Sequence, residues 1–310
     1  MTSSDHTASR RTVLTAFAAA AAAGAPLIGQ LAAATPAAAF DPNSTTEYPS
    51  NTKLYQDPDL VEGNQYGRRW RRHDRFDVKL SEKSDYARTA ILALHGGGIE
   101  KGTSELALGI AGYDPGDLVG ADNLPAPAIL PTTYDYFLFE GLLSEGNKAL
   151  HVTSKNCDDH IALSLARSHF NVLSLHGCTF DQIKLPTSEF PTTGNRAVAV
   201  VGGLNPAFRA ALVTEIKNAG FQAVDAYNSK YSSTLGEFNG SHVTNPCNLT
   251  MLGMGAQLEL TGELRASLFG DYDSRSGRAT TWNQSGGRFE AFRDACRRAV
   301  ATVEATQPIL

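Results

Sequence analysis

Short, nearly continuous apolar segments alternate with amphipathic segments along most of this chain, and this alternation constrains the fold more than any other feature. The apolar segments include "TAILALHGG" at 89–97, "NVLSLHG" at 171–177 and "RAVAVVGGLN" at 196–205. Strands that are buried on both faces have this composition. The segments at 158–170 and 206–220 have the spacing of amphipathic helices. The alternation predicts an α/β fold with a mixed, mostly parallel central sheet and helices on both faces.

The first 39 residues have the composition of an export signal. "SRRTVL" at 9–14 precedes a long Ala-rich stretch that ends in "TPAAAF". Paired arginines, an apolar middle and a small-residue cleavage pattern are typical of a twin-arginine signal peptide. A transmembrane helix is the weaker interpretation, because the stretch is mostly alanine and only modestly apolar. We expect cleavage near Ala39–Phe40 and a secreted chain without a stable membrane anchor, periplasmic if the host has an outer membrane.

The remaining sequence predicts one large domain preceded by an arm. Residues 40–60 are polar with scattered prolines, and the five arginines of "YGRRWRRHDRFDVKL" at 66–80 favour a solvated strand over a site for a polyanion. We therefore expect an extended arm and a first strand over 40–84, and the main domain over 85–310. A segment at 114–131 that is rich in Pro, Gly and Asp predicts an insertion that could act as a lid.

Charge and cysteine content exclude some functions. The formal net charge is −5 over 310 residues, so the chain is a poor binder of nucleic acid. Export permits disulfides, but the twin-arginine route carries folded proteins, so pairing stays open, as does the oligomeric state. No Cys-x-x-Cys pair occurs, which argues against a thiolate zinc site. The cysteines are Cys157, Cys178, Cys247 and Cys296.

Histidines follow two of the predicted strands and lie within a third. His95 ends "AILAL", His176 ends "NVLSL", and His151 lies in "ALHVTS", which we predict to be a strand at 149–154. In open α/β sheets the ligand crevice lies at the carboxyl ends of the strands. One histidine in such a place is usually a local hydrogen-bonding residue. Two that are each followed by glycine, which permits sharp turns, indicate a site.

The segment "HGGGIE" at 95–100 has two chemical interpretations. As the oxyanion loop of a serine esterase it needs a Gly-x-Ser-x-Gly elbow. No serine has glycine both two positions before and two positions after it; Ser104 has Gly102 before it but Leu106 after it. The serine esterase therefore stays a minor alternative.

The other interpretation is a metal site. His95 and Glu100 are joined by flexible glycines and can bind the same ion, and His176 can complete the set of two His and one Glu that is common in catalytic zinc sites. Zinc lowers the pKa of its water and polarises a carbonyl, and a separate carboxylate must move the proton. Glu259, between two leucines in "GAQLELTGELR", fits this role, although an acid on the solvent face of an edge strand has the same pattern.

Six segments in order resemble the poly-γ-glutamate hydrolase family, which includes phage enzymes that cut the poly-γ-glutamate capsule. They are "HGGGIEKGTSELA", "YDYFLFEG", "LHVTS", "SLHGC", "VVGGLN" and "GAQLEL". The resemblance extends from about residue 85 to 270. It implies a zinc carboxypeptidase-like fold, with one Zn²⁺ at the strand ends of the 85–310 domain.

The resemblance also implies roles for particular residues. His95, Glu100 and His176 stand where the family's zinc ligands stand, and Glu259 matches its general base. The implied reaction is hydrolysis of a γ-glutamyl amide bond, in which a zinc-bound water attacks the carbonyl and Glu259 carries the proton to the leaving amine.

Substrate contacts and one departure follow from the same resemblance. Arg265 matches an arginine that could hold a substrate carboxylate, and Lys101 could add to a cationic lining for an anionic glutamyl polymer or peptide. His151 could line the site or act as an alternative third ligand. Leu249 stands where relatives have an arginine, so the peptidase class is better supported than the substrate.

The leading prediction is therefore a secreted zinc-dependent hydrolase that acts on poly-γ-glutamate. The main alternative is a non-catalytic, peptidase-like module that binds a glutamate polymer or a cell-wall peptide. Glu259→Gln would separate the two, because only an enzyme would lose turnover.

Overall fold

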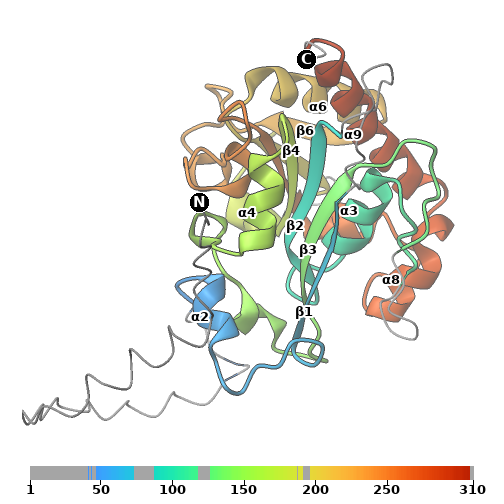
Figure 1. Cartoon of the computed structure of the whole chain (residues 1–310). Coiled ribbons are helices and arrows are strands. Elements are labelled where there is room, and N and C mark those ends of the chain that lie inside the picture. The colour runs from blue at the N-terminus through green and yellow to red at the C-terminus, as the bar shows by residue number, and fades with distance from the viewer. Residues whose placement is uncertain are drawn as a thin grey trace, which may run out of the picture. The chain divides into compact units, whose positions relative to one another are not determined.

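The structure is a computed structural model, and the predicted signal at 1–39 and residues 118–125 of the predicted insertion lie outside the residues that it describes. Residues 39–310 form one compact unit (Figure 1). No helix in the described ranges is both long and apolar enough to cross a membrane. The described residues are 41, 43, 47–72, 87–117, 126–186, 188–190 and 196–307.

Within these residues, seven strands form one sheet in the order β1-β3-β2-β4-β7-β5-β6. β3, β2, β4 and β7 run parallel, whereas β1 pairs antiparallel with β3 and β5 antiparallel with β7. The predicted mixed sheet is confirmed. The strands are β1 (Tyr66–Arg71), β2 (Thr89–Gly97), β3 (Asp135–Gly141), β4 (Asn171–Cys178), β5 (Val198–Gly202), β6 (Gln222–Asp225) and β7 (Ala256–Thr261).

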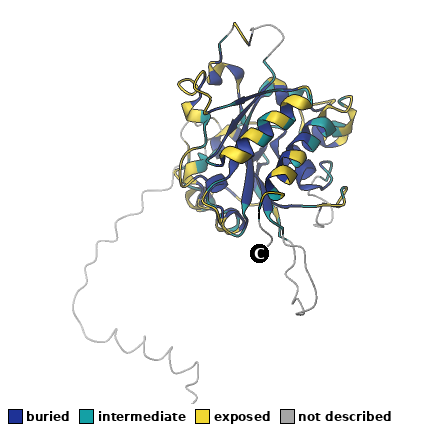
Figure 2. Cartoon of the chain, turned by 90° about the horizontal axis from the view of Figure 1, so that it is seen from above, coloured by how far each residue is buried: buried dark blue, intermediate teal, exposed yellow. Residues whose placement is uncertain are grey.

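Helices cover both faces of the sheet, as predicted. Buried side chains of α3, α6 and α9 share one core with Ile91 and Leu258, and those of α2 and α4 share another with Leu92. Figure 2 shows the buried sheet between helices whose outer sides are exposed. The α-helices are α2 (Asn51–Tyr55), α3 (Thr103–Ala111), α4 (His160–Arg167), α5 (Phe180–Ile183), α6 (Pro206–Asn218), α7 (Gly262–Ala266), α8 (Arg275–Thr281) and α9 (Arg288–Glu304). The 3₁₀ helices are η1 (Asn147–Leu150), η2 (Ser154–Asn156), η3 (Gly236–Phe238), η4 (Pro246–Asn248) and η5 (Trp282–Gln284).

Two local predictions were wrong. The segment at 149–154 is not a strand but the end of η1 and the start of η2; the carbonyl of Val152 accepts from a histidine ring, not from a neighbouring strand. The arm is not wholly extended, because Ser50 caps α2 and Leu54 is fully buried against the sheet.

The four cysteines are buried free thiols. The structure therefore contains none of the disulfide pairings that the sequence left open.

Candidate metal centre

Two neighbouring strands bring His95 and His176 together. β2 and β4 are parallel, so their carboxyl ends meet at the same edge of the sheet. The two Nδ1 atoms are 3.1 Å apart, and both side chains are buried. The loops that follow β2 and β3 lie at the lower end of the sheet in Figure 1.

The glycine loop after His95 returns Glu100 to the same place. Gly97 has φ of 63°, and a Cβ there would lie 2.4 Å from the carbonyl of Gly141, so only glycine fits. The chain turns back until the amide of Glu100 donates to the carbonyl of His95 at 2.8 Å. The carboxylate then lies with Oε1 3.2 Å from His95 Nδ1 and Oε2 3.9 Å from His176 Nδ1.

The amides of this loop are already used, which counts against the oxyanion loop of a serine esterase. The Gly97 amide donates to Ser104 Oγ at 3.0 Å, and the Gly98 amide donates to the carbonyl of Gly141 at 2.9 Å. Donors that are bound to the protein cannot also meet a developing oxyanion.

The outer hydrogen bond of His95 turns a lone pair toward the cluster. His95 Nε2 lies 2.8 Å from the carbonyl of Val152, which can only accept, so this nitrogen carries a proton. His176 Nε2 lies 2.9 Å from Ser174 Oγ, a hydroxyl that can accept from this nitrogen or donate to it. With Nε2 protonated, the neutral His95 ring has Nδ1 as an acceptor, and this atom faces His176 Nδ1 and the Glu100 carboxylate. Two imidazoles and one carboxylate are a donor set that fits zinc.

His151 adds a third ring to this cluster. Its centroid lies 3.9 Å from that of His95, and its Nε2 lies 3.8 Å from Glu100 Oε1. One ligand atom each from His95, Glu100 and His151 lies within 4.8 Å of the others. The structure therefore places His151 among the metal-ligating candidates, beside the three that the sequence singled out.

The ionisation of these groups shows how strongly they interact. Burial opposes the charge of Glu100, but the surrounding histidines, His95 first, lower its pKa to about 2. Burial and the charge of His95 lower the pKa of His176 to about 3 and that of His151 to about 4. Burial alone would lower the pKa of His95, yet Glu100 raises it.

Glu259 lies directly beside this cluster. It pairs in register with His176 across β4 and β7, so the two side chains are on the same face of the sheet. Its Oε1 accepts from Gln257 Nε2 at 3.1 Å. Burial, and then the negative charge of Glu100, raise its pKa well above the usual range.

Arg265 and Lys101, the two predicted substrate-binding cations, differ in how their side chains are hydrogen-bonded. The buried guanidinium of Arg265 makes four hydrogen bonds to protein oxygens, those of Leu260, Lys101, Tyr272 and Cys178. Its grip on a substrate carboxylate stays a prediction, and this geometry favours a role in holding the loop. Lys101 Nζ donates to the Asp273 carbonyl at 2.9 Å on the exposed side.

Several residues that hydrogen-bond to the candidate site residues were not predicted from the sequence. Ser174 lies two positions before His176, and Gln257 lies two positions before Glu259. Residues two apart in a strand share a face, so this spacing could have identified both. Glu47 accepts from His151 Nδ1 at 2.9 Å. No local pattern could have found it, because the contact spans 104 residues.

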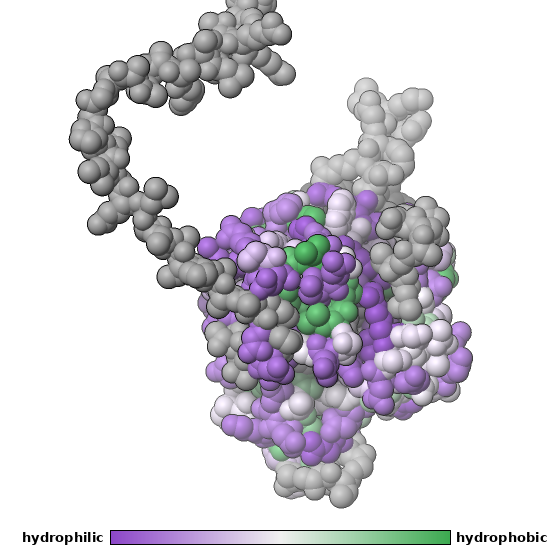
Figure 3. Space-filling view, turned by 90° about the horizontal axis from the view of Figure 1, so that it is seen from below, coloured by the Kyte–Doolittle hydropathy of each residue, from purple (hydrophilic) through white to green (hydrophobic). Residues whose placement is uncertain are grey.

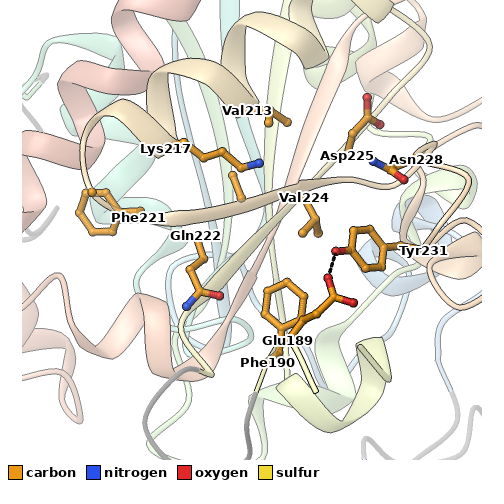
Figure 4. Close-up of a pocket in the computed structure, with 12 residues that line it drawn as sticks. Glu189, Phe190, Val213, Lys217, Phe221, Gln222, Val224, Asp225, Asn228 and Tyr231 are labelled. Carbon is orange, nitrogen blue, oxygen red and sulfur yellow. Dashed lines mark hydrogen bonds between the residues drawn. The ribbon is translucent and has the colours of Figure 1, made fainter. Parts of the chain in front are cut away.

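A cavity of about 700 Å³ lies elsewhere, beside the edge strand β6 (Figure 4). Its lining includes Lys217, Asp225 and Tyr231, whose hydroxyl donates to Glu189. None of the metal-ligating candidates lines it, so it has no part in the site described above.

Comparison with known proteins gives a consistent result. The sequence model of a family described as poly-gamma-glutamate hydrolase matches residues 69–117 and 123–295. UPF0714 protein YndL of Bacillus subtilis is 32% identical over 225 residues, which cover 73% of this chain and 72% of YndL. The prophage-derived UPF0714 protein YoqZ of the same organism is 32% identical over 197 residues, or 64% of this chain and 57% of YoqZ.

Two solved structures are also similar. A bacteriophage poly-gamma-glutamate hydrolase has a TM-score of 0.61 and 23% identity, over 84% of this chain and 99% of its own. The zinc-free apo form of YndL has a TM-score of 0.58 and 28% identity, over 82% of this chain and 96% of its own.

Proposed function

This chain belongs to the poly-gamma-glutamate hydrolase family, and we propose that it is a zinc-dependent hydrolase of γ-glutamyl amide bonds whose substrate is poly-γ-glutamate. The observation that carries the proposal is the cluster of His95, Glu100 and His151, whose ligand atoms lie within 4.8 Å of one another, with His176 Nδ1 3.1 Å from His95 Nδ1. That a solved form of YndL is called zinc-free supports the choice of metal.

The histidines and Glu100 are the metal ligands in this proposal. His95, Glu100 and His176 would hold the ion, and His151, which forms a metal-capable group with His95 and Glu100, would join or replace one of them. When bound, zinc lowers the pKa of a water molecule and polarises the carbonyl of the scissile amide. The outer hydrogen bonds of the two rings with Val152 and Ser174 would keep the rings oriented for a bound ion.

Glu259 moves the proton in this proposal. Gln257 binds its Oε1, so Oε2 is the oxygen that would take a proton from the attacking water. The same oxygen would then give the proton to the departing amine nitrogen, which becomes a neutral leaving group. The in-register position of Glu259 beside His176 supports this role.

The surroundings suit a charged, hydrated substrate. Figure 3 shows the protein from below, the end at which the loops after β2 and β3 lie, and hydrophilic side chains surround a smaller hydrophobic area there. The ammonium of Lys101 has three donors, and one hydrogen bond to the Asp273 carbonyl leaves others for a substrate carboxylate. We also propose that the twin-arginine signal exports the protein to where such a polymer occurs.

The test is to incubate purified protein with poly-γ-glutamate, with and without a chelator, and to measure product size. We expect shorter chains without chelator, none with it, and recovery when zinc is restored. Glu263→Gln is the matched control for Glu259→Gln, because Glu263 is a solvent-accessible carboxylate four residues away that pairs with Arg196. An uncut polymer that still binds to the protein would instead support the non-catalytic module.

A further inference from the structure

One side chain at the metal centre comes from outside the part of the chain that matches the family. The family match begins at residue 69, whereas Glu47 lies in the arm that precedes it. Its carboxylate accepts from His151 Nδ1 at 2.9 Å, and it also accepts from the hydroxyl of Thr153. The arm therefore contacts one of the candidate ligands directly.

The residues after Glu47 fix the arm at this position. Tyr48 donates its hydroxyl to Asp57, and the amide of Thr52 donates to Asp158 Oδ1 at 2.8 Å. Leu54 is fully buried in the core beneath α2. These contacts anchor residues 48–54, and Glu47 directly precedes them, with its side chain 47% exposed.

The bond determines which nitrogen of His151 faces the site. A carboxylate can only accept, so Nδ1 of His151 carries the proton in this contact. In the neutral ring Nε2 is then the lone-pair nitrogen, and it is the atom that lies 3.8 Å from Glu100 Oε1. A carboxylate that fixes the tautomer and orientation of a ligating histidine raises its basicity and the affinity for metal.

We propose that Glu47 is a positioning residue that holds His151 with Nε2 toward the metal, so that the arm completes the metal centre. This inference rests on the proposed zinc-dependent function. It gives a role in metal affinity to the arm, which lies outside the family-matched part of the chain.

Zinc affinity of the full chain, measured by competition with a chromophoric chelator, tests the proposal. We expect Glu47→Ala to weaken zinc binding by about 10–100-fold, the usual effect of removing such a partner. Glu47→Gln keeps an acceptor without charge, so its loss is expected to be smaller. Glu62→Ala is the matched control, because Glu62 is in the same arm but pairs with Arg68; it is expected to bind zinc as the wild type does.

A second measurement does not depend on zinc. Long-range ¹H–¹⁵N spectra of the histidine rings in metal-free protein at neutral pH report which nitrogen carries the proton. We expect His151 to be protonated at Nδ1 in the wild type and in Glu62→Ala, and to be a mixture of tautomers in Glu47→Ala. Thr153→Val removes one hydrogen-bond partner of Glu47 and leaves His151 as the other. It is expected to change the His151 tautomer ratio less than Glu47→Ala does, and it replaces that variant if Glu47→Ala does not fold.

The outcomes separate the two proposals. Zinc affinity of Glu47→Ala within about twofold of the wild type, or an unchanged His151 tautomer, would overturn the role of Glu47. A wild-type protein that binds no zinc would instead overturn the proposed function on which this role rests.

Discussion

Two buried histidine–carboxylate pairs stand at opposite ends of the same sheet. His95 and Glu100 lie at the carboxyl end of β2 with 3.2 Å between Nδ1 and Oε1. His169 and Asp135 lie at the amino ends of β4 and β3 with 3.1 Å between Nε2 and Oδ2. Judged by residue type, distance and burial alone, the pairs are nearly the same.

Their surroundings differ. The second nitrogen of His169 lies 2.6 Å from the carbonyl of Leu165, so this ring has a donor bond on one side and a carboxylate on the other. Nδ1 of His95 faces Glu100 and a second imidazole, that of His176. The comparison teaches that a buried pair can be structural, and that the convergence of several acceptors on one point is what indicates a metal centre.

The largest expected effect concerns Glu259, a carboxylate that lies beside the His95–Glu100 pair and has no counterpart, among the residues that the structure describes, beside the His169–Asp135 pair. Glu259→Gln should lower kcat on poly-γ-glutamate by about 10²–10⁴-fold, since this is what a positioned acid or base contributes. Zinc content should stay at the wild-type value. A variant that keeps more than about a tenth of the wild-type kcat would show that Glu259 is not the base.

The second effect sets the two ends of the sheet against each other. His176→Ala should weaken zinc binding by roughly two to three orders of magnitude, because it removes one of a few ligands that share a binding energy of about 10–16 kcal/mol. His169→Ala should leave zinc affinity unchanged. Zinc affinity is measured by competition titration. Equal losses of affinity in the two variants would contradict the assignment of the metal centre to the His95 end of the sheet.

The third effect is on stability. Asp135→Asn removes the charged partner of a buried ring, and the free energy of unfolding should fall by about 1–3 kcal/mol. The measurement is denaturant unfolding of metal-free protein, with zinc stoichiometry determined in parallel. Loss of zinc without loss of stability would contradict a structural role for this pair.

The smallest effect concerns the orientation of Glu259. Gln257→Leu removes the amide that binds Oε1, and we expect kcat to fall about tenfold, equivalent to a hydrogen bond of roughly 1–1.5 kcal/mol. KM should change little, because this side chain amide is hydrogen-bonded to Glu259, Phe238 and Asn245. A change in KM alone would indicate that Gln257 contacts the substrate instead.

Much of the fold could be predicted because its signals are local. The segment at 89–97 is apolar, ends in glycines and forms β2 with those bounds, and parallel strands then place His95 and His176 at one edge. The segment at 149–154 was predicted wrongly, since a short run with β-branched residues does not show whether a neighbouring strand is available to pair with it.

The unpredicted parts of the site depend on contacts between distant residues. Glu47 lies in a polar segment that has the composition of a linker, and its contact with His151 spans 104 residues. Arg265 has the sequence context of a surface arginine near the site, yet Lys101 and Cys178 supply carbonyls that bind its guanidinium. Sequence spacing carries no information about partners that lie 87 to 164 residues away.

The most direct test of the central claim is a crystal structure of the zinc-loaded protein with anomalous scattering recorded at the zinc edge. The claim predicts one strong peak within coordination distance, about 2.0–2.2 Å, of His95, Glu100 and His176 or His151. A peak at the His169–Asp135 pair, or none at the carboxyl ends of β2 and β4, would contradict it.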